Sequence, residues 1–372
     1  MATASQTSSL DTAPADRKTV LRQRAHSALA TRYQVKRLLG QGQFGAVYEV
    51  FDRSKDQTYA AKVLTHVNDS VRTEVEILKR FTKDGCQPNI VCYRDSFDIA
   101  DEQGTMFVIL TDFIDGIDLD QLRRLNGSHF LPARAARNLL QSLLFALARA
   151  HEVGIAHQDL KPKNIMYNVA TQQPYIVDFG LAYATVGLPP KDGDEAVGQS
   201  GVVAATDRNT GGENAGAPLE VAHCCNGSRL FFSPEKILRC VRRELSRHCT
   251  FAMRKQADVW ALGLSILDTL FPSTVFANMK SFADVIAKRA NQMVDEQYPN
   301  IKENERAAYS MLALYNLFSG GQIDIGQYRP DPLVVVPILK SMMVFNPNER
   351  ATAIEAYINL EQKLASLQSD AV

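Results

Sequence analysis

The pattern of apolar and polar positions changes near residue 116. Before it, short apolar runs separated by turn residues predict strands at 33–40, 46–52, 58–64 and 107–114. The run VRTEVEILKRF at 71–81 has apolar residues at helical spacing and predicts one helix. The first part of the chain is therefore expected to be strand-rich.

After residue 116 the apolar periodicity becomes helical. The stretches that predict helices are 133–154, 257–271, 332–345 and 351–367. A short segment at 113–118 joins the two regions. We therefore predict an α+β, bilobal fold with a strand-rich lobe at 31–113, a helical lobe at 114–368 and a cleft between them.

Two segments lack this pattern. Residues 1–30 are rich in Ala, Ser and Thr and predict a flexible tail. Residues 186–222 are rich in Gly, Ala and Asp and predict a flexible inserted loop. The loop either docks a partner or inhibits the chain, or it is an insert without a role.

Composition narrows the function classes. Lys plus Arg equals Asp plus Glu at 41 each, which gives no electrostatic case for nucleic-acid or membrane binding. Six cysteines without a CxxC pair favour reduced thiols inside a cell. The first residues lack the apolar core of a signal peptide, and no apolar run is long enough to span a bilayer. A cytoplasmic or nuclear location is expected by elimination.

A glycine-rich segment, LGQGQFGAV, covers 39–47. Gly40, Gly42 and Gly45 fit the form GxGxxGxV, in which missing Cβ atoms let the backbone approach phosphates. The same spacing occurs in dinucleotide-binding folds, where a helix follows it. Here the strand-like run 46–52 follows, which favours a strand–turn–strand flap over phosphates.

A lysine and an acid follow the flap. Lys62 lies inside an apolar strand, where a charge is costly unless it is paired. Glu74, on the predicted helix at 71–81, is the candidate partner. The alternative is a surface lysine and a solvated acid.

The segment HQDLKPKN at 157–164 carries the chemistry of phosphoryl transfer. Asp159 can accept a hydroxyl proton, Lys161 can neutralise a phosphoryl group, and Asn164 can offer an amide oxygen to a metal ion. Asp178, in IVDFG, offers a second hard oxygen ligand suited to Mg²⁺. A lone DFG would be a common strand-ending turn, but the ordered set of motifs argues against chance.

Further motifs support the resemblance of this sequence to one protein family. SPE stands at 233–235, Asp258 and Trp260 lie in DVWALG, and Arg350 stands where a buried arginine would pair with Glu235. From about Tyr33 to residue 367 the sequence resembles the eukaryotic protein kinase family. The resemblance implies ATP and Mg²⁺ as substrate and cofactor, and protein substrates.

The resemblance also implies roles residue by residue. Lys62 matches the lysine that binds the α- and β-phosphates, and Glu74 matches its helix partner. Asp159 matches the catalytic base, and Asn164 and Asp178 match the metal ligands. The positions implied around adenine are Leu39, Val47, Ala60 and Met166, the gatekeeper Thr111, and the hinge from Asp112 to Ile114.

Lys161 and Ser228 resemble the serine/threonine class. The expected function is thus an ATP- and Mg²⁺-dependent protein serine/threonine kinase. One alternative is a pseudokinase scaffold that binds partners without catalysis, although intact Lys62, Asp159, Asn164 and Asp178 argue against it. A second is a kinase of small molecules, against which SPE and Arg350 count.

The sequence departs from the family at Gln158, in the unusually long segment between DFG and SPE, and in the stretch 236–255, which is also longer than usual. Gln158 replaces an arginine that usually meets a phosphate on the activation loop, which suggests either that no such phosphate is needed or that glutamine is simply tolerated. The basic stretch 236–255 is read as a solvated helix face, or else as a site for acidic substrates.

Two minor readings remain. Zinc ligands could be imagined at His223, Cys224, Cys225, His248 and Cys249, but their spacing argues against this. The long insert, KPKNIMYN and VDFGLAYAT are similar to the kinase group that triggers replication origins, which implies an activating regulatory subunit as a partner.

Overall fold

The computed structural model describes most of the chain outside the predicted tail and insert. The described residues are 17–42, 45–65, 69–101, 104–127, 129–185, 225–241, 249–270, 288, 291–292, 294–297, 299–300, 313 and 330–369. The loop predicted at 186–222 lies outside these residues. The chain divides into two compact units, Met1–Val75 with Val91–Ile114, and Glu76–Ile90 with Asp115–Val372.

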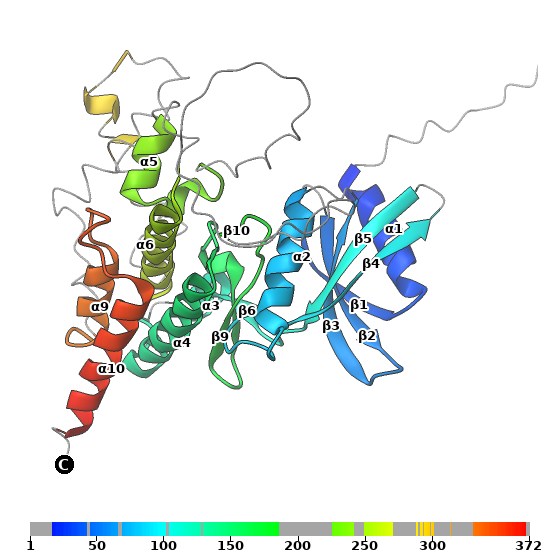
Figure 1. Ribbon diagram of the computed structural model, residues 1–372, viewed down its shortest axis with the longest axis horizontal. Helices are drawn as coiled ribbons and strands as arrows, with labels where there is room; N and C mark the ends of the chain where they lie inside the picture. The colour runs from blue at the N-terminus through cyan, green and yellow to red at the C-terminus, as the bar shows by residue number, and fades with distance from the viewer. Residues whose placement is uncertain are drawn as a thin grey trace, which may run out of the picture. The chain divides into compact units, whose positions relative to one another are not determined.

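The first unit is built on a five-stranded antiparallel sheet with the order β1-β2-β3-β5-β4 (Figure 1). Its strands are β1 (Gln34–Gln41), β2 (Gly45–Asp52), β3 (Gln57–Leu64), β4 (Tyr93–Asp101) and β5 (Gly104–Asp112). Four of them agree with the predicted strands to within a few residues. The fourth strand, β4, was not predicted, because its sequence YRDSFDIAD is mostly polar and gives no apolar run.

One face of this sheet is covered by a helix that sequence reasoning missed. Helix α1 (Arg17–Ala30) packs against β1, β2 and β4 (Figure 1). Ala25 and Leu29 are fully buried in the sheet core beside Tyr48. Arg24 adds an ion pair with Asp101, with Nε 2.5 Å from Oδ2. The prediction of a flexible tail is therefore wrong for residues 17–30, and residues 1–16 lie outside the described part.

Helix α2 (Asp69–Thr82) confirms the helix predicted at 71–81. Its apolar residues recur every three or four positions and are buried, as the amphipathic pattern requires. These residues are Val71, Val75, Ile77, Leu78 and Phe81.

The second unit is mainly helical. Its longer helices are α4 (Ala133–Glu152), α6 (Phe251–Leu270) and α10 (Ala353–Ser369), with the shorter α3 (Leu119–Leu125), α5 (Pro234–Val241) and α9 (Val335–Met342). Helix α6 is buried on every side from Ala257 to Leu270; α4 and α9 pack against it, and α10 packs against α4 and α9. The predicted helices are thus confirmed, and the α+β class with them.

The second unit also contains short strands, two of which, β7 and β8, flank the loop that carries Asp159. They are β6 (Ile117–Asp118), β7 (Ile155–Ala156), β8 (Ile165–Asn168), β9 (Gln173–Ile176) and β10 (Tyr183–Ala184). Strands β6, β8 and β9 form one small sheet, and β10 pairs with β7. The 3-10 turns η1 (Pro162–Asn164) and η2 (Arg229–Phe231) complete the described elements.

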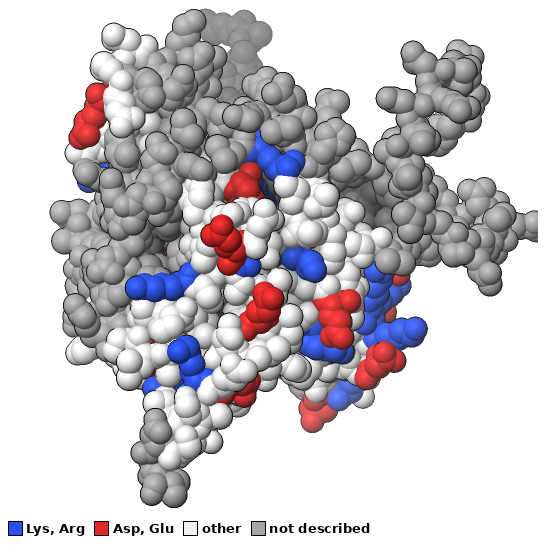
Figure 2. All heavy atoms as spheres, turned by 60° about the vertical axis from the view of Figure 1, so that its left-hand side comes forward, with Lys and Arg blue, Asp and Glu red and all other residues white. Residues whose placement is uncertain are grey.

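The surface agrees with the balanced composition. On the face in Figure 2, acidic and basic side chains of the described residues lie interspersed among uncharged ones. Within the described part of the chain, no helix is both long and apolar enough to cross a bilayer.

The cysteines contradict the expectation of reduced thiols. Cys225 and Cys240 form a disulfide. No free cysteine occurs among the described residues. Cys225 is therefore not available as the zinc ligand considered above, while His223, Cys224 and His248 lie outside the described residues.

Candidate active site

The glycine-rich segment lies on two paired strands, as predicted, and residues 43–44 between them are outside the described part. Strand β1 pairs with β2, with Gly40 opposite Val47, and the amide of Gly42 donates to the carbonyl of Gly45 at 2.9 Å. A Cβ atom at Gly45 would lie 2.4 Å from the carbonyl oxygen of Val63. Strand β2 therefore requires glycine at its first residue, Gly45, because a larger residue would collide with the neighbouring strand β3.

Lys62 and Glu74 form the predicted ion pair. The Lys62 Nζ lies 2.7 Å from Oε1 and 2.9 Å from Oε2 of Glu74. The Glu74 side chain is only 6% exposed, so its charge requires this partner. The pair ties strand β3 to helix α2 within the first unit.

One sheet face carries the side chains expected around a nucleotide. Side chains alternate between faces along a strand, and Ala46, Ala61 and Leu110 point into the core under α1. Their neighbours Val47, Ala60, Lys62 and Thr111 therefore lie on the opposite face. They are cross-strand neighbours there, since Val47 pairs with Lys62 and Ala60 with Thr111.

The remaining expected nucleotide residues border this face or lie in the other unit. Leu39 is 39% exposed on β1. Asp112 ends β5, donates its amide to the Cys92 carbonyl at 2.9 Å, and pairs its carboxylate with Arg94. Ile114 is half-buried just after it. Met166 belongs to the second unit, in β8, where it pairs with Tyr175 of β9.

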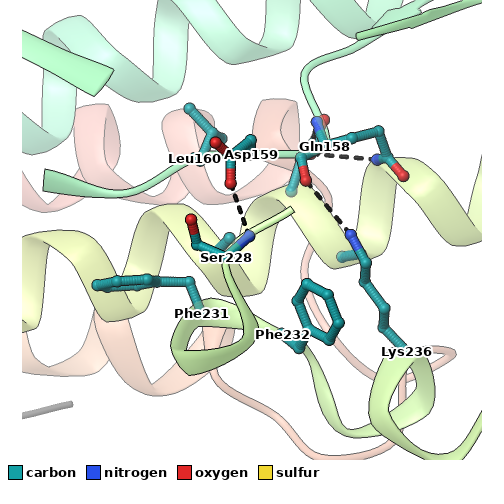
Figure 3. A pocket seen from close by; sticks show the side chains of 10 residues that line it. Gln158, Asp159, Leu160, Ser228, Phe231, Phe232 and Lys236 are labelled. Carbon is teal, nitrogen blue, oxygen red and sulfur yellow. Dashed lines mark hydrogen bonds between the residues drawn. The ribbon is translucent and has the colours of Figure 1, made fainter. Parts of the chain in front are cut away.

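Asp159 lies in the loop between β7 and β8, among three donors. Its Oδ2 accepts from the Lys161 Nζ at 2.6 Å and from the Asn164 Nδ2 at 3.1 Å. Its Oδ1 accepts from the backbone amide of Ser228 at 2.7 Å, although Ser228 is 69 residues away in the sequence (Figure 3). The structure thus brings together the acid, lysine and amide that the spacing suggested.

The contact of Ser228 with Asp159 was not predicted from the sequence. Besides capping Asp159, its Oγ accepts from the Lys161 Nζ at 2.9 Å. Gly227, just before it, has φ +112°, and a Cβ there would lie 2.6 Å from the Gln158 carbonyl oxygen. The close approach of this segment to the loop therefore depends on glycine.

Asp178 follows strand β9 with a left-handed backbone, φ +63°. Such a conformation is uncommon outside glycine, and backbone strain of this kind is found repeatedly at functional sites. The next residue, Phe179, is buried and packs against His157 with ring centroids 4.8 Å apart. His157 accepts from the Asp159 amide at Nδ1, and its Nε2 bonds the Val177 carbonyl at 3.1 Å. One imidazole thus joins the Asp159 loop to the segment before Asp178.

Asp258, buried in α6, anchors the same loop. Its carboxylate accepts from the backbone amides of His157 and Gln158 at 2.7 and 2.8 Å, and it contacts the His151 Nε2 at 3.2 Å. Burial alone would raise the pKa of Asp258. The hydrogen bond and charge of His151, with the other donors, outweigh it and hold the pKa below its usual value.

Two basic residues of the stretch 236–255 are buried and not solvated, whereas residues 242–248 lie outside the described part. Lys236 is 7% exposed and donates to the Gln158 carbonyl at 3.3 Å. Arg254 is 2% exposed. The burial of these two residues was not predicted, because a run of charged residues usually indicates a solvated surface. The available signal was spacing, since Arg254 lies four residues before Asp258 and therefore on the same face of a helix.

Glu235 and Arg350 form the predicted pair. Arg350 Nη1 and Nη2 each lie 2.8 Å from an oxygen of Glu235.

A small hollow of about 10 Å³ lies beside the Asp159 loop, lined by Asp159, Ser228, Phe232 and Lys236 among others (Figure 3). A hollow of this size holds about one water molecule.

Comparison with known proteins gives consistent matches. Residues 33–359 match the sequence profile of the family described as protein kinase domain. The chain is 35% identical over 170 residues to serine/threonine-protein kinase dkf-1 of Caenorhabditis elegans, covering 41% of this chain and 22% of that protein. It is 32% identical over 224 residues to serine/threonine-protein kinase PknD of Mycobacterium tuberculosis, covering 58% and 32%.

A third match covers more of both proteins. The chain is 27% identical over 264 residues to probable cell division control protein 7 homolog 2 of Encephalitozoon cuniculi, covering 66% of this chain and 67% of that protein. By contrast, the chain spans about a fifth of the length of dkf-1 and about a third of PknD.

Proposed function

The chain belongs to the protein kinase family, and we propose that it is an ATP- and Mg²⁺-dependent protein serine/threonine kinase. It would transfer the γ-phosphoryl group of ATP to hydroxyls of protein substrates. The observation that carries this proposal is the Asp159 cluster, with the Lys161 ammonium 2.6 Å and the Asn164 amide 3.1 Å from one carboxylate oxygen. Phosphoryl transfer depends on positioning and charge stabilisation, and this cluster can supply both.

In the proposed step the substrate hydroxyl oxygen attacks the γ-phosphorus. The bond from that phosphorus to the bridging oxygen breaks, ADP leaves, and the hydroxyl proton passes to Asp159. Hydrogen bonds from Ser228 and Asn164 hold the carboxylate in one orientation. Lys161 supports the same step because its ammonium can neutralise charge on the transferred group.

Asn164 and Asp178 fit a magnesium ion by the chemistry of their donors. The Asn164 amide nitrogen donates to the Asp159 carboxylate and carbonyl, so its oxygen is not turned toward that acid. An amide oxygen and a carboxylate are hard ligands suited to Mg²⁺. When bound, the metal would neutralise charge on the phosphate oxygens.

We assign nucleotide binding to the glycine flap and to the sheet face that bears Lys62. The flap, Gly40, Gly42 and Gly45, would cover the phosphates, and Lys62, oriented by Glu74, would bind the α- and β-phosphates. Apolar side chains on that face suit a flat ring. The proposed adenine contacts are Leu39, Val47, Ala60, Thr111, Asp112, Ile114 and Met166.

The serine/threonine preference is supported by the relatives' names and by Lys161. Its ammonium contacts both Asp159 and the Ser228 hydroxyl, which joins the two motifs that resemble this class. A regulatory subunit as a partner is a further proposal, which rests on the similarity of the insert, KPKNIMYN and VDFGLAYAT to the kinase group that triggers replication origins.

The test is transfer of labelled phosphate from ATP and Mg²⁺ to a degenerate peptide library with Ser, Thr or Tyr as acceptor. Label on Ser and Thr peptides that depends on added Mg²⁺ supports the proposal. Label confined to Tyr peptides overturns the serine/threonine assignment. ATP binding without transfer, with or without a candidate regulatory subunit, would favour the scaffold alternative.

A further inference from the structure

Gln158, at the position where the family usually has arginine, is buried and fully engaged. It is 7% exposed and has φ +67°. Its Nε2 donates to the Arg254 carbonyl at 3.2 Å and to Asp258 Oδ1 at 3.3 Å. Its Oε1 accepts from Arg254 Nη1 at 3.2 Å. An amide can donate and accept at once, whereas arginine has no acceptor for the Arg254 guanidinium.

Arg254 contacts a second segment of the proposed active site. Its guanidinium lies over the ring of Tyr183, with Cζ 4.3 Å from the ring centroid, a geometry that stabilises a buried cation. Tyr183 is five residues after Asp178 and pairs with Ala156 of β7, just before the Asp159 loop. One side chain from α6 therefore holds the Asp159 loop through Gln158 and the segment after Asp178 through Tyr183.

We propose that Arg254 is a positioning residue for phosphoryl transfer, which orders the Asp159 loop and the segment after Asp178 without a phosphate on the activation segment. The proposal rests on the function proposed above. In the usual arrangement the cation belongs to the catalytic loop and its partner is an added phosphate. Here the cation comes from α6, and its partners, an amide and an aromatic ring, belong to the chain itself.

The charges around Gln158 agree with this reading. Among the described residues, Lys236 of α5 and Arg254 of α6 are the cations that contact Gln158, and Asp258 is the acid. Both cations are nearly buried, so an arginine at position 158 would add a third positive charge beside them. The site therefore accommodates a neutral side chain at position 158, and Arg254 already supplies the positive charge there.

The experiment compares variants in the full chain. Arg254→Met should lower kcat about 10- to 100-fold, since small displacements of catalytic groups have effects of this size. The KM for ATP should stay within about twofold, because Gln158 and Tyr183, which the Arg254 side chain contacts, are not among the proposed nucleotide residues. Lys255→Met, which removes the adjacent half-buried cation of the same helix, is the matched control and should keep wild-type kcat. Equal kcat in Arg254→Met and Lys255→Met would overturn the proposal.

A side-chain exchange separates positioning from a general loss of folding. Gln158→Arg and Arg254→Gln should each lower kcat, while the double variant restores one donor–acceptor pair and should recover at least tenfold over the weaker single variant. If Arg254→Met does not fold, this cycle still decides the question. Additive losses in the double variant would contradict the proposal.

Phosphatase treatment tests whether phosphoryl transfer is independent of a phosphate on the activation segment. Wild-type kcat should be unchanged after treatment, and also in the triple variant of Ser200, Thr206 and Thr210 to alanine. A large loss in either experiment would refute this part of the inference. A wild-type chain that transfers no phosphate before treatment, both with and without a candidate regulatory subunit, would instead overturn the proposed function, and the inference with it.

Discussion

The buried pair of Glu235 and Arg350 offers a quantitative test of the second unit. The Arg350 side chain is fully buried and that of Glu235 is 13% exposed. The pair is bidentate, with both N–O distances 2.8 Å. Arg350 also donates to the carbonyls of Val344 and Gln256 at 2.9 and 2.7 Å. Glu235→Gln keeps the size of the side chain but removes the only negative charge in this set of contacts.

The expected loss follows from the cost of an uncompensated buried charge. Removing one partner of a buried ion pair costs about 3–5 kcal/mol. Glu235 is slightly exposed and Gln retains one acceptor oxygen, so we expect a value near the lower limit, about 3 kcal/mol. Arg350→Met should cost at least as much, because backbone carbonyls then lose their donor as well.

Urea unfolding followed by tryptophan emission measures this loss. The chain has one tryptophan, Trp260. Its ring centroid lies 5.1 Å from the Arg350 Cζ, so the emission reports on this part of the protein. Glu152→Gln is the control, since Glu152 forms an exposed pair with Arg149 whose loss should cost under about 1 kcal/mol. If Glu235→Gln unfolds at the same urea concentration as Glu152→Gln, the reasoning is refuted.

Further predictions concern the loop, a buried lysine and the proposed ligands. Gly227→Ala should lower activity and destabilise by about 1–3 kcal/mol, whereas Gly127→Ala, also at positive φ but in open space, should cost less; equal losses in thermal melts would contradict a close-approach role. Burial lowers the pKa of Lys236 from 10.5 to about 8, so the unfolded chain binds more protons between these values and stability should rise with pH there. Measured by urea unfolding relative to Lys236→Met, the free energy of unfolding of the wild type should rise by up to about 3 kcal/mol over this pH range. A wild-type pH profile parallel to that of Lys236→Met would refute this prediction. Asp178→Ala or Lys62→Met should abolish nearly all transfer with the fold retained by circular dichroism; retained turnover in Asp178→Ala would refute the metal assignment.

Periodicity was enough to predict the main elements of both units. Burial alternates strictly along β2 and along β3 as far as Val63, and α4 and α10 have long helical patterns, so the sequence carries a strong local signal there. Helix α1 gave no such signal. Its buried residues include Ala25, Ala28 and Leu29, and two small side chains with one leucine do not form a visible apolar stripe.

The candidate site was predictable where chemistry lies close together in the chain. Asp159, Lys161 and Asn164 are separated by a few residues, and their contacts follow from the loop itself. The contact of Ser228 with Asp159 joins residues 69 apart, which no local pattern reports. Arg254 was misread for a different reason. Its burial depends on Gln158 and Tyr183, which come from two other segments of the chain.

The most direct test of the account is a single-turnover measurement at saturating ATP and Mg²⁺ on wild type and Asp159→Asn. As a general base, Asp159 should contribute about 10²- to 10⁴-fold to the transfer rate, with ATP affinity unchanged. We predict a loss of this size in Asp159→Asn and rapid transfer to a serine peptide by wild type. An Asp159→Asn chain that transfers phosphate at the wild-type rate would contradict the central claim.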